Sequence, residues 1–168
     1  MDLMVEIQKK DNPFISDVDK VEIQIDNLPL DAAGRVKPET LHEARFSIYF
    51  LAALSLAEGK VTTENLTEEK LSSPEIEALR KKITTHGFFN ICLSSHVKVH
   101  MKDGTIYEGQ TSAPKGSSDN PLTAGELKDK FMITSGLSPG RAKKVIERVM
   151  ELENVESAAE ILSLIRQE

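Results

Sequence analysis

The chain has 168 residues, of which 39% are hydrophobic, and a formal net charge of −6 at pH 7. This length supports one compact domain with a sizeable core. The acidic charge argues against nucleic acid as a partner, because phosphate backbones repel it. The first residues lack a basic n-region, and no stretch reaches the roughly 20 apolar residues that span a bilayer. We therefore expect a cytoplasmic protein that has no membrane partner.

The sequence divides into two parts. Residues 1–17 form an N-terminal segment with at most a short strand over 5–7, and residues 18–168 form one domain. Over residues 19–26 the apolar residues Val21, Ile23 and Ile25 alternate with polar ones. This pattern predicts a half-buried strand. The next segment, 28–40, has no periodicity and is punctuated by Pro and Gly, so we expect a long loop.

Helical spacing dominates the next stretch. Apolar residues three and four apart predict a mostly buried helix over 41–58, and Gly59 suits its left-handed C-terminal position. A second helix begins with Ser73 as N-cap and Pro74 at the first helical position, and we expect it to end near Ile83.

A β-hairpin is predicted from 95 to 109, because alternating residues flank the tight turn at Asp103-Gly104. The alternation puts His96 and His100 on one polar face. A metal pair is one interpretation, but neither Cys nor a carboxylate stands at the next matching position. We favour solvated histidines and expect no metal.

Three helices close the chain. Thr123 and Glu126 form a capping box that opens the first helix. Two further helices are expected over 141–152 and 157–165, the last with a second capping box from Ser157 and Glu160. Together these elements predict an α+β fold, with a small antiparallel sheet, packed helices and C-terminal helices.

The chain has one cysteine, Cys92, within an apolar run. One cysteine excludes an internal disulfide and fits a reducing compartment, so we expect its thiol in the core. Catalysis by this thiol would require a neighbouring base. The sequence has no nucleophile elbow, P-loop, metal-spaced cluster or dinucleotide fingerprint, and we expect no cofactor. Residues 113–118 could hold an anion through Lys115, although turn chemistry explains this segment equally well.

Five short motifs, in order and at matching spacing, resemble the C-terminal half of the MmgE/PrpD family, the 2-methylcitrate dehydratase type of enzyme. The resemblance covers roughly residues 18–165. The motifs are Glu43-Ala44-Arg45-Phe46-Ser47, Leu56-Ala57-Glu58-Gly59-Lys60-Val61, Gly116 with Asn120-Pro121-Leu122-Thr123, Glu126-Leu127, and Lys130-Phe131.

The resemblance implies a part of a two-domain enzyme. Members of the family join a large helical domain, which carries most acid–base residues, to a smaller α+β lid. They dehydrate 2-methylcitrate, decarboxylate cis-aconitate or epimerise iminodisuccinate, generally without a metal. Their shared step is plausibly proton removal beside a carboxylate, with cations holding the substrate charge. By this resemblance Arg45, Ser47 and Lys115 are candidate substrate-binding residues.

The family tyrosine is not matched here, because Phe50 falls on its position and cannot donate a proton. Tyr49 stands one residue away, about 100° around a helix. The catalytic residue is therefore unknown, with Tyr49 as the one candidate and Phe50 interpreted as core.

The functional expectation is a stand-alone lid domain that is inactive without a separately encoded helical domain. The alternative is a non-catalytic binding or interaction module on the same scaffold. In either case surplus apolar residues predict a partner surface, namely Phe46, Phe50, Phe131 and the apolar faces of the last two helices. That partner is the helical domain or, in a homo-oligomer, a second copy of the chain.

Overall fold

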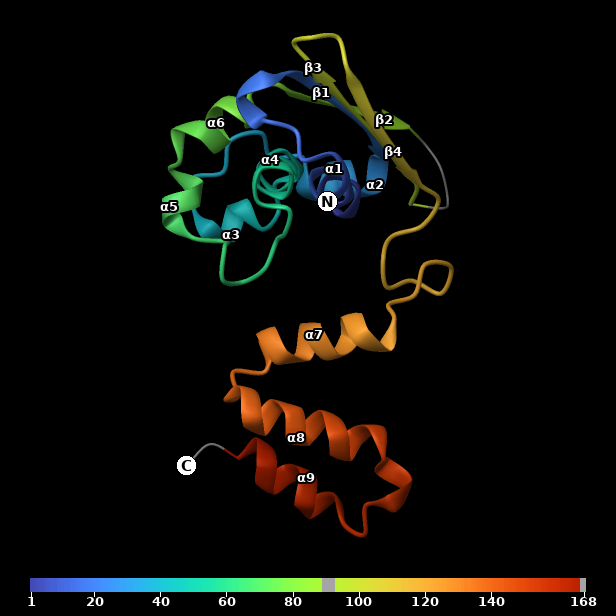
Figure 1. Cartoon of the computed structure of the whole chain (residues 1–168). Helices are drawn as coiled ribbons and strands as arrows, with labels where there is room; N and C mark the ends of the chain where they lie inside the picture. Colours follow the sequence, from blue (N-terminus) through green and yellow to red (C-terminus); the bar gives the residue numbers. More distant parts are fainter. Residues whose placement is uncertain (89–92, 167–168) are drawn as a thin grey trace. The chain divides into compact units, whose positions relative to one another are not determined.

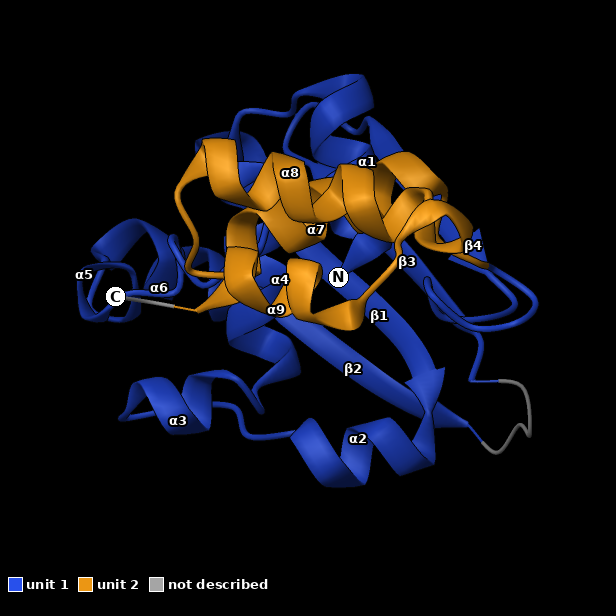
Figure 2. Cartoon of the chain, turned by 90° about the horizontal axis from the view of Figure 1, so that it is seen from below, with its two compact units in different colours: residues 1–120 blue, residues 121–168 orange. Residues whose placement is uncertain are grey.

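The computed structural model of the chain describes residues 1–88 and 93–166 (Figure 1). Cys92 lies outside the described residues, so its burial stays a prediction. The chain forms two compact units, Met1–Asn120 and Pro121–Glu168 (Figure 2). Their boundary falls inside the single domain predicted over residues 18–168, which stays a prediction.

The first unit is built on a four-stranded sheet with the strand order β2-β1-β3-β4. β1 (Val18–Asp26) pairs antiparallel with β3 (Ser95–Met101), and β3 pairs antiparallel with β4 (Ile106–Thr111) in the predicted hairpin. β2 (Ile83–Phe88) runs parallel to β1. The α+β class is confirmed, whereas the sheet is mixed and not antiparallel as predicted. A helix was expected to end near Ile83, the first residue of β2, and residues 84–88 were assigned to no element, because Ile-Thr-Thr-His-Gly-Phe does not alternate in polarity.

One face of the sheet is covered by helices and the other is open. Val21, Ile23, Val97 and Val99 lie buried on the covered face. Figure 1 shows α1 (Asp2–Asp11) and α4 (Ile48–Glu58) beneath this face. The polar residues that alternate with these apolar ones therefore lie on the open face.

Helix α1 corrects the expectation of a short strand at residues 5–7. Leu3, Met4 and Ile7 are buried with helical spacing, and Asn12 takes the left-handed conformation that ends the helix. Three residues are fewer than one helical turn, so the segment 5–7 cannot reveal the helical period, which appears only when Leu3 and Met4 are included.

The segment from 27 to 47 also differs from expectation. The predicted loop contains α2 (Asn27–Ala33), which the Asp26 carboxylate caps at the amide of Leu28 and which carries Pro29 in its first turn. The predicted helix over 41–58 is two helices, α3 (Leu41–Ala44) and α4. Their break lies at Ser47, the N-cap of α4.

Helix α4 forms the centre of the core. Phe50, Leu54 and Leu56 are almost wholly buried, and Gly59 ends the helix with φ 64° as predicted. α5 (Glu68–Leu71) and α6 (Pro74–Arg80) follow, and the predicted Ser73 cap and Pro74 start are confirmed. α6 ends at Arg80, before Ile83, and so leaves the chain free to enter β2.

The second unit consists of three helices, α7 (Ala124–Thr134), α8 (Pro139–Met150) and α9 (Ala158–Ile165). The capping box of Thr123 and Glu126 is confirmed. The Ser157 hydroxyl caps α9 by accepting from the amide of Ala159, whereas the predicted capping box uses the amide of Glu160. Within residues 1–88 and 93–166, no helix combines the length and hydropathy needed to span a membrane.

Candidate functional site

Three of the predicted site residues lie at the beginning of α4. Arg45 is exposed, whereas Ser47 is fully buried. The Ser47 hydroxyl donates to the carbonyl of Arg35 at 2.6 Å and accepts from the amide of Phe50 at 3.1 Å. A hydroxyl has one proton to donate, and here the backbone uses it. Ser47 thus caps a helix and anchors a loop, and its predicted role in substrate binding would require this cap to open.

Tyr49 has a partner in a strand that was not predicted. Its hydroxyl lies 2.7 Å from the Thr85 hydroxyl of β2, and either oxygen can donate. The Tyr49 side chain is half-buried against the core. A positioned phenol is one of the groups that enzymes use for proton transfer. The catalytic role of Tyr49 stays a prediction.

Phe50 has only 1% of its surface exposed and lies within the hydrophobic core cluster. This confirms its interpretation as a core residue. Because the side chain is apolar and enclosed by other apolar side chains, this position offers no proton donor to a ligand.

The loop over 34–40 is held at several points beside the start of α4. Gly34 forms a β-bridge with Ser47, and the buried Arg80 guanidinium donates to the carbonyl of Val36. Glu43 forms an ion pair with Arg35 at 3.0 Å and accepts from the amide of Glu39. These contacts fix the loop in one position.

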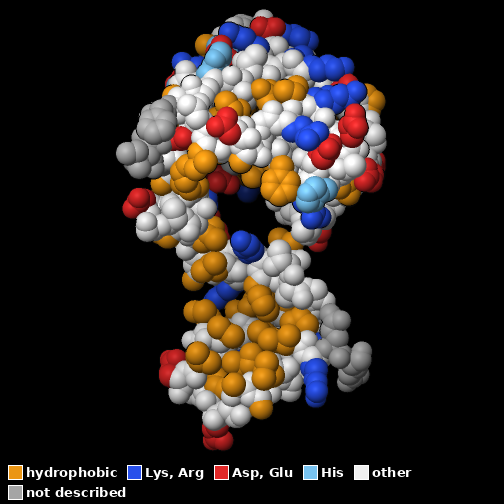
Figure 3. Space-filling model, turned by 180° about the vertical axis from the view of Figure 1, so that it is seen from behind, with side chains coloured by type: hydrophobic (Ala, Val, Ile, Leu, Met, Phe, Trp, Pro, Cys, Tyr) orange, Lys and Arg blue, Asp and Glu red, His pale blue; other side chains and the backbone are white. Residues whose placement is uncertain are grey.

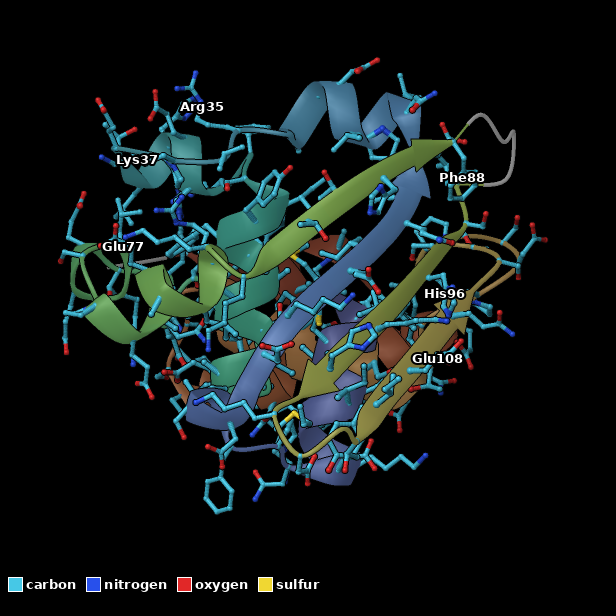
Figure 4. The ribbon with its side chains drawn as sticks, turned by 90° about the horizontal axis from the view of Figure 1, so that it is seen from above. Arg35, Lys37, Glu77, Phe88, His96 and Glu108 are labelled. Atoms are coloured by element: carbon cyan, nitrogen blue, oxygen red, sulfur yellow. The ribbon has the colours of Figure 1, made fainter. Side chains whose placement is uncertain are left out.

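Basic side chains border this loop. Figure 4 shows Arg35 and Lys37 near Glu77 at one edge of the unit. A hydrogen bond from Lys81 lowers the pKa of the Glu77 carboxyl, and the charges of Arg80 and Lys37 act in the same direction. The Arg35 guanidinium is paired with Glu43, and the charge of Lys37 acts on Glu77. Carboxylates therefore balance the basic side chains of this edge.

Lys115 lies elsewhere. It is exposed in the turn after β4. In this turn the backbone amide of Gly116 donates to the carbonyl of Asn120, and the side-chain amide of Asn120 donates to the carbonyl of Ala113. Figure 1 places this turn and α3 at opposite sides of the first unit. The structure therefore does not bring Lys115 together with Arg45 and Ser47.

The open face of the sheet carries a second polar cluster. The prediction that His96 and His100 share this face is confirmed by the register, and His86 of β2 stands in line with Gln24 and His96. The histidines are not simply solvated. His96 Nε2 lies 2.5 Å from a Glu108 oxygen, and His100 Nε2 lies 2.7 Å from a Glu22 oxygen. Figure 4 shows the side chains of His96 and Glu108 beside one another.

These pairs have a defined chemistry. A hydrogen bond from Lys20, followed by one from His100, lowers the pKa of the Glu22 carboxyl. A carboxylate that orients an imidazole is an arrangement used in proton transfer and in ion pairing. In the parts of the chain that the structure describes, no three His, Cys, Asp or Glu side chains are arranged to hold a metal ion. The sequence analysis did not identify His86 as a member of this cluster, because it did not predict β2.

Comparison with known proteins gives two results. The model of the MmgE/PrpD C-terminal domain matches residues 1–153, so the match includes the first 17 residues. A cis-aconitate decarboxylase of Mus musculus is 26% identical over 140 residues, which cover 79% of this chain and 29% of that protein. A cis-aconitate decarboxylase of Homo sapiens is 25% identical over 157 residues, which cover 89% of this chain and 32% of that protein. The chain thus spans about a third or less of these relatives.

Proposed function

Because the chain belongs to the MmgE/PrpD family through its C-terminal domain, we propose that it is the lid part of a lyase or isomerase. The substrate is a carboxylic acid such as 2-methylcitrate or cis-aconitate. Catalysis also requires a helical domain, which we propose to be a second polypeptide. The observation that carries this proposal is the match of the MmgE/PrpD C-terminal domain to residues 1–153, in which the family tyrosine position holds the buried Phe50.

The described side chains support a shared site. The family tyrosine position holds the buried Phe50, and the backbone uses the Ser47 hydroxyl. Proton removal beside a carboxylate needs a positioned base and fixed positive charge. This chain supplies the charge, through the exposed Lys37 and Arg45, and Tyr49 as a proton donor. The helical domain supplies the base.

The test is turnover followed by proton NMR in heavy water. The substrates are 2-methylcitrate, cis-aconitate and iminodisuccinate. Each is incubated with the chain alone and with a mixture of the chain and a helical MmgE/PrpD domain encoded in the same genome. We expect turnover only in the mixture. Arg45→Ala should raise KM in the mixture, whereas Lys9→Ala, an exposed cation on α1, should leave it unchanged. Turnover by the chain alone would contradict the proposal.

A non-catalytic binding or interaction module is the second candidate. The buried Phe50 favours it, because the position that carries a tyrosine in the family has no reactive group here. A stable complex with the helical domain, but without turnover of any of the three acids, would establish this module and exclude the split enzyme.

A further inference from the structure

The open face of the sheet has a hollow that the proposed function does not use. Its volume is about 250 Å³, and its lining comes from three neighbouring strands: Glu22 and Gln24 from β1, His86 from β2, and His96 and Lys98 from β3. A cavity of about 150 Å³ accommodates one benzene, so this hollow has room for a small molecule. Figure 4 looks onto this face, with the helices behind the sheet. The hollow is therefore separate from the start of α4.

The carboxylates of this face already have cationic or N–H partners. Lys20 Nζ lies 3.1 Å from one Glu22 oxygen, and His100 Nε2 lies 2.7 Å from the other. Neither Lys20 nor His100 lines the hollow, so both act on Glu22 from beside it. On the next strand pair, the Glu108 carboxylate lies 2.5 Å from His96 Nε2. The acceptors of the face are therefore engaged, and a ligand in the hollow meets mainly donors.

Three lining side chains have unused donors. Among the described residues, the Gln24 amide and the His86 imidazole have no hydrogen-bond partner within the protein. Lys98 Nζ lies 3.9 Å from a Glu108 oxygen, which is beyond hydrogen-bond distance. The sheet register holds the three groups together, because Gln24 pairs with His86, and Glu22, two residues before Gln24, pairs with Lys98. An ammonium, a primary amide and an imidazole can each donate an N–H.

We propose that this hollow binds the oxyanion of a small molecule, a carboxylate or a phosphate group, whose oxygens accept from Lys98, Gln24 and His86. The site is new to the chain and does not depend on the proposed function. Figure 3 shows Lys and Arg side chains of the first unit interspersed with Asp and Glu on the face in view. A nucleic acid requires cations aligned along its backbone, so the arrangement favours a small anion.

Carbon-edited proton NMR of the histidine imidazoles tests this binding on the full chain. Sulfate is the tetrahedral probe and acetate the planar one, and each replaces chloride at constant ionic strength. We expect the His86 signals to shift and saturate with a Kd on the order of 1 mM, whereas the His42 signals of α3 stay in place. Tighter binding of sulfate identifies a phosphate ligand, and tighter binding of acetate a carboxylate. Shifts that never saturate, or that include His42 equally, would overturn the proposal.

Variants locate the binding and fix the sign of the ligand charge. Lys98→Ala should raise the Kd of the tighter probe at least about fivefold, because it removes the ammonium from the lining. Lys9→Ala, which removes an exposed cation of α1, should change this Kd by less than about twofold. Glu22→Gln should lower it at least about threefold, because a neutral amide replaces a negative wall of similar shape. A cationic ligand would respond to Glu22→Gln in the opposite direction.

Two outcomes would reject the inference. One is an equal effect of Lys98→Ala and Lys9→Ala on the Kd, and the other is weaker binding in Glu22→Gln. Far-ultraviolet circular dichroism verifies that each variant folds. If Lys98→Ala does not fold, Gln24→Ala at an exposed position takes its place and should raise the Kd at least about twofold. Anion binding without turnover in the mixed enzyme assay would leave this site standing and reject only the split enzyme.

Discussion

The Tyr49 hydroxyl of α4 lies 2.7 Å from the Thr85 hydroxyl of β2, so one hydrogen bond ties the start of the central helix to an edge strand. Tyr49→Phe and Thr85→Val should each lower the free energy of unfolding by about 0.5–1.5 kcal/mol. Because both changes remove the same bond, the double variant should lose less than the sum. Urea unfolding of the four proteins measures this coupling, and additive losses would show that the bond contributes nothing.

Ser47→Ala should be more damaging than removal of an exposed helix cap. The loss of the α4 cap costs about 0.5–2 kcal/mol, and the carbonyl of Arg35 also loses its partner. The control is Thr40→Ala, which removes the exposed cap of the four-residue helix α3. We expect the Ser47 variant to lose at least about 1 kcal/mol more than the control in urea unfolding. Equal losses would mean that the contact with Arg35 is dispensable.

Phe50→Tyr restores the residue type of the family and tests the interpretation of this position as core. A hydroxyl added at a site with 1% exposure should lower stability by about 1–3 kcal/mol, because the core has no room or partner for it. Phe46→Tyr, at 52% exposure, is the matched control and should stay within about 0.5 kcal/mol of the unchanged protein. Thermal unfolding compares the two. A stable Phe50→Tyr variant with increased turnover would contradict the interpretation.

The Glu22 pairs predict a dependence of stability on acid. Lys20 and then His100 lower the pKa of Glu22 below its ordinary value of 4.5 in the folded chain. The folded state therefore binds this proton less readily than the unfolded state, and the stabilisation is present above pH 4.5 and lost as pH falls through the lowered pKa. Glu22→Gln should remove this component. Its deficit in unfolding free energy should shrink as pH falls below 4.5, and a constant deficit would exclude the linkage.

Local signals in the sequence predicted the elements that depend on local contacts. The hairpin around Asp103-Gly104, the Thr123 capping box and the Ser73 start of α6 all appear as expected, because each is decided within a few residues. β2 was missed because its pairing with β1 compensates for a sequence without alternation. The break at Ser47 was missed because apolar residues continue across it, whereas the contacts that form there, with Gly34 and Arg35, come from a distant loop.

The candidate site shows the same limit. Sequence reasoning placed Arg45, Ser47 and Tyr49 in one helix, whereas they lie around the junction of α3 and α4. It had no access to their environments, since the burial of Ser47 depends on a loop twelve residues earlier and the Tyr49 hydroxyl meets a strand thirty-six residues later. Lys115 was grouped with Arg45 and Ser47 by the family resemblance, and the fold places its turn and α3 at opposite sides of the first unit.

The most direct test of the proposed split enzyme is a titration of this chain with the separately expressed helical domain, while proton NMR records the turnover of cis-aconitate and 2-methylcitrate. The account predicts no turnover without the helical domain, and a rate that rises until the two polypeptides are equimolar and then stays constant. Turnover at a fixed rate per chain without the helical domain, or no turnover at any ratio, would contradict it.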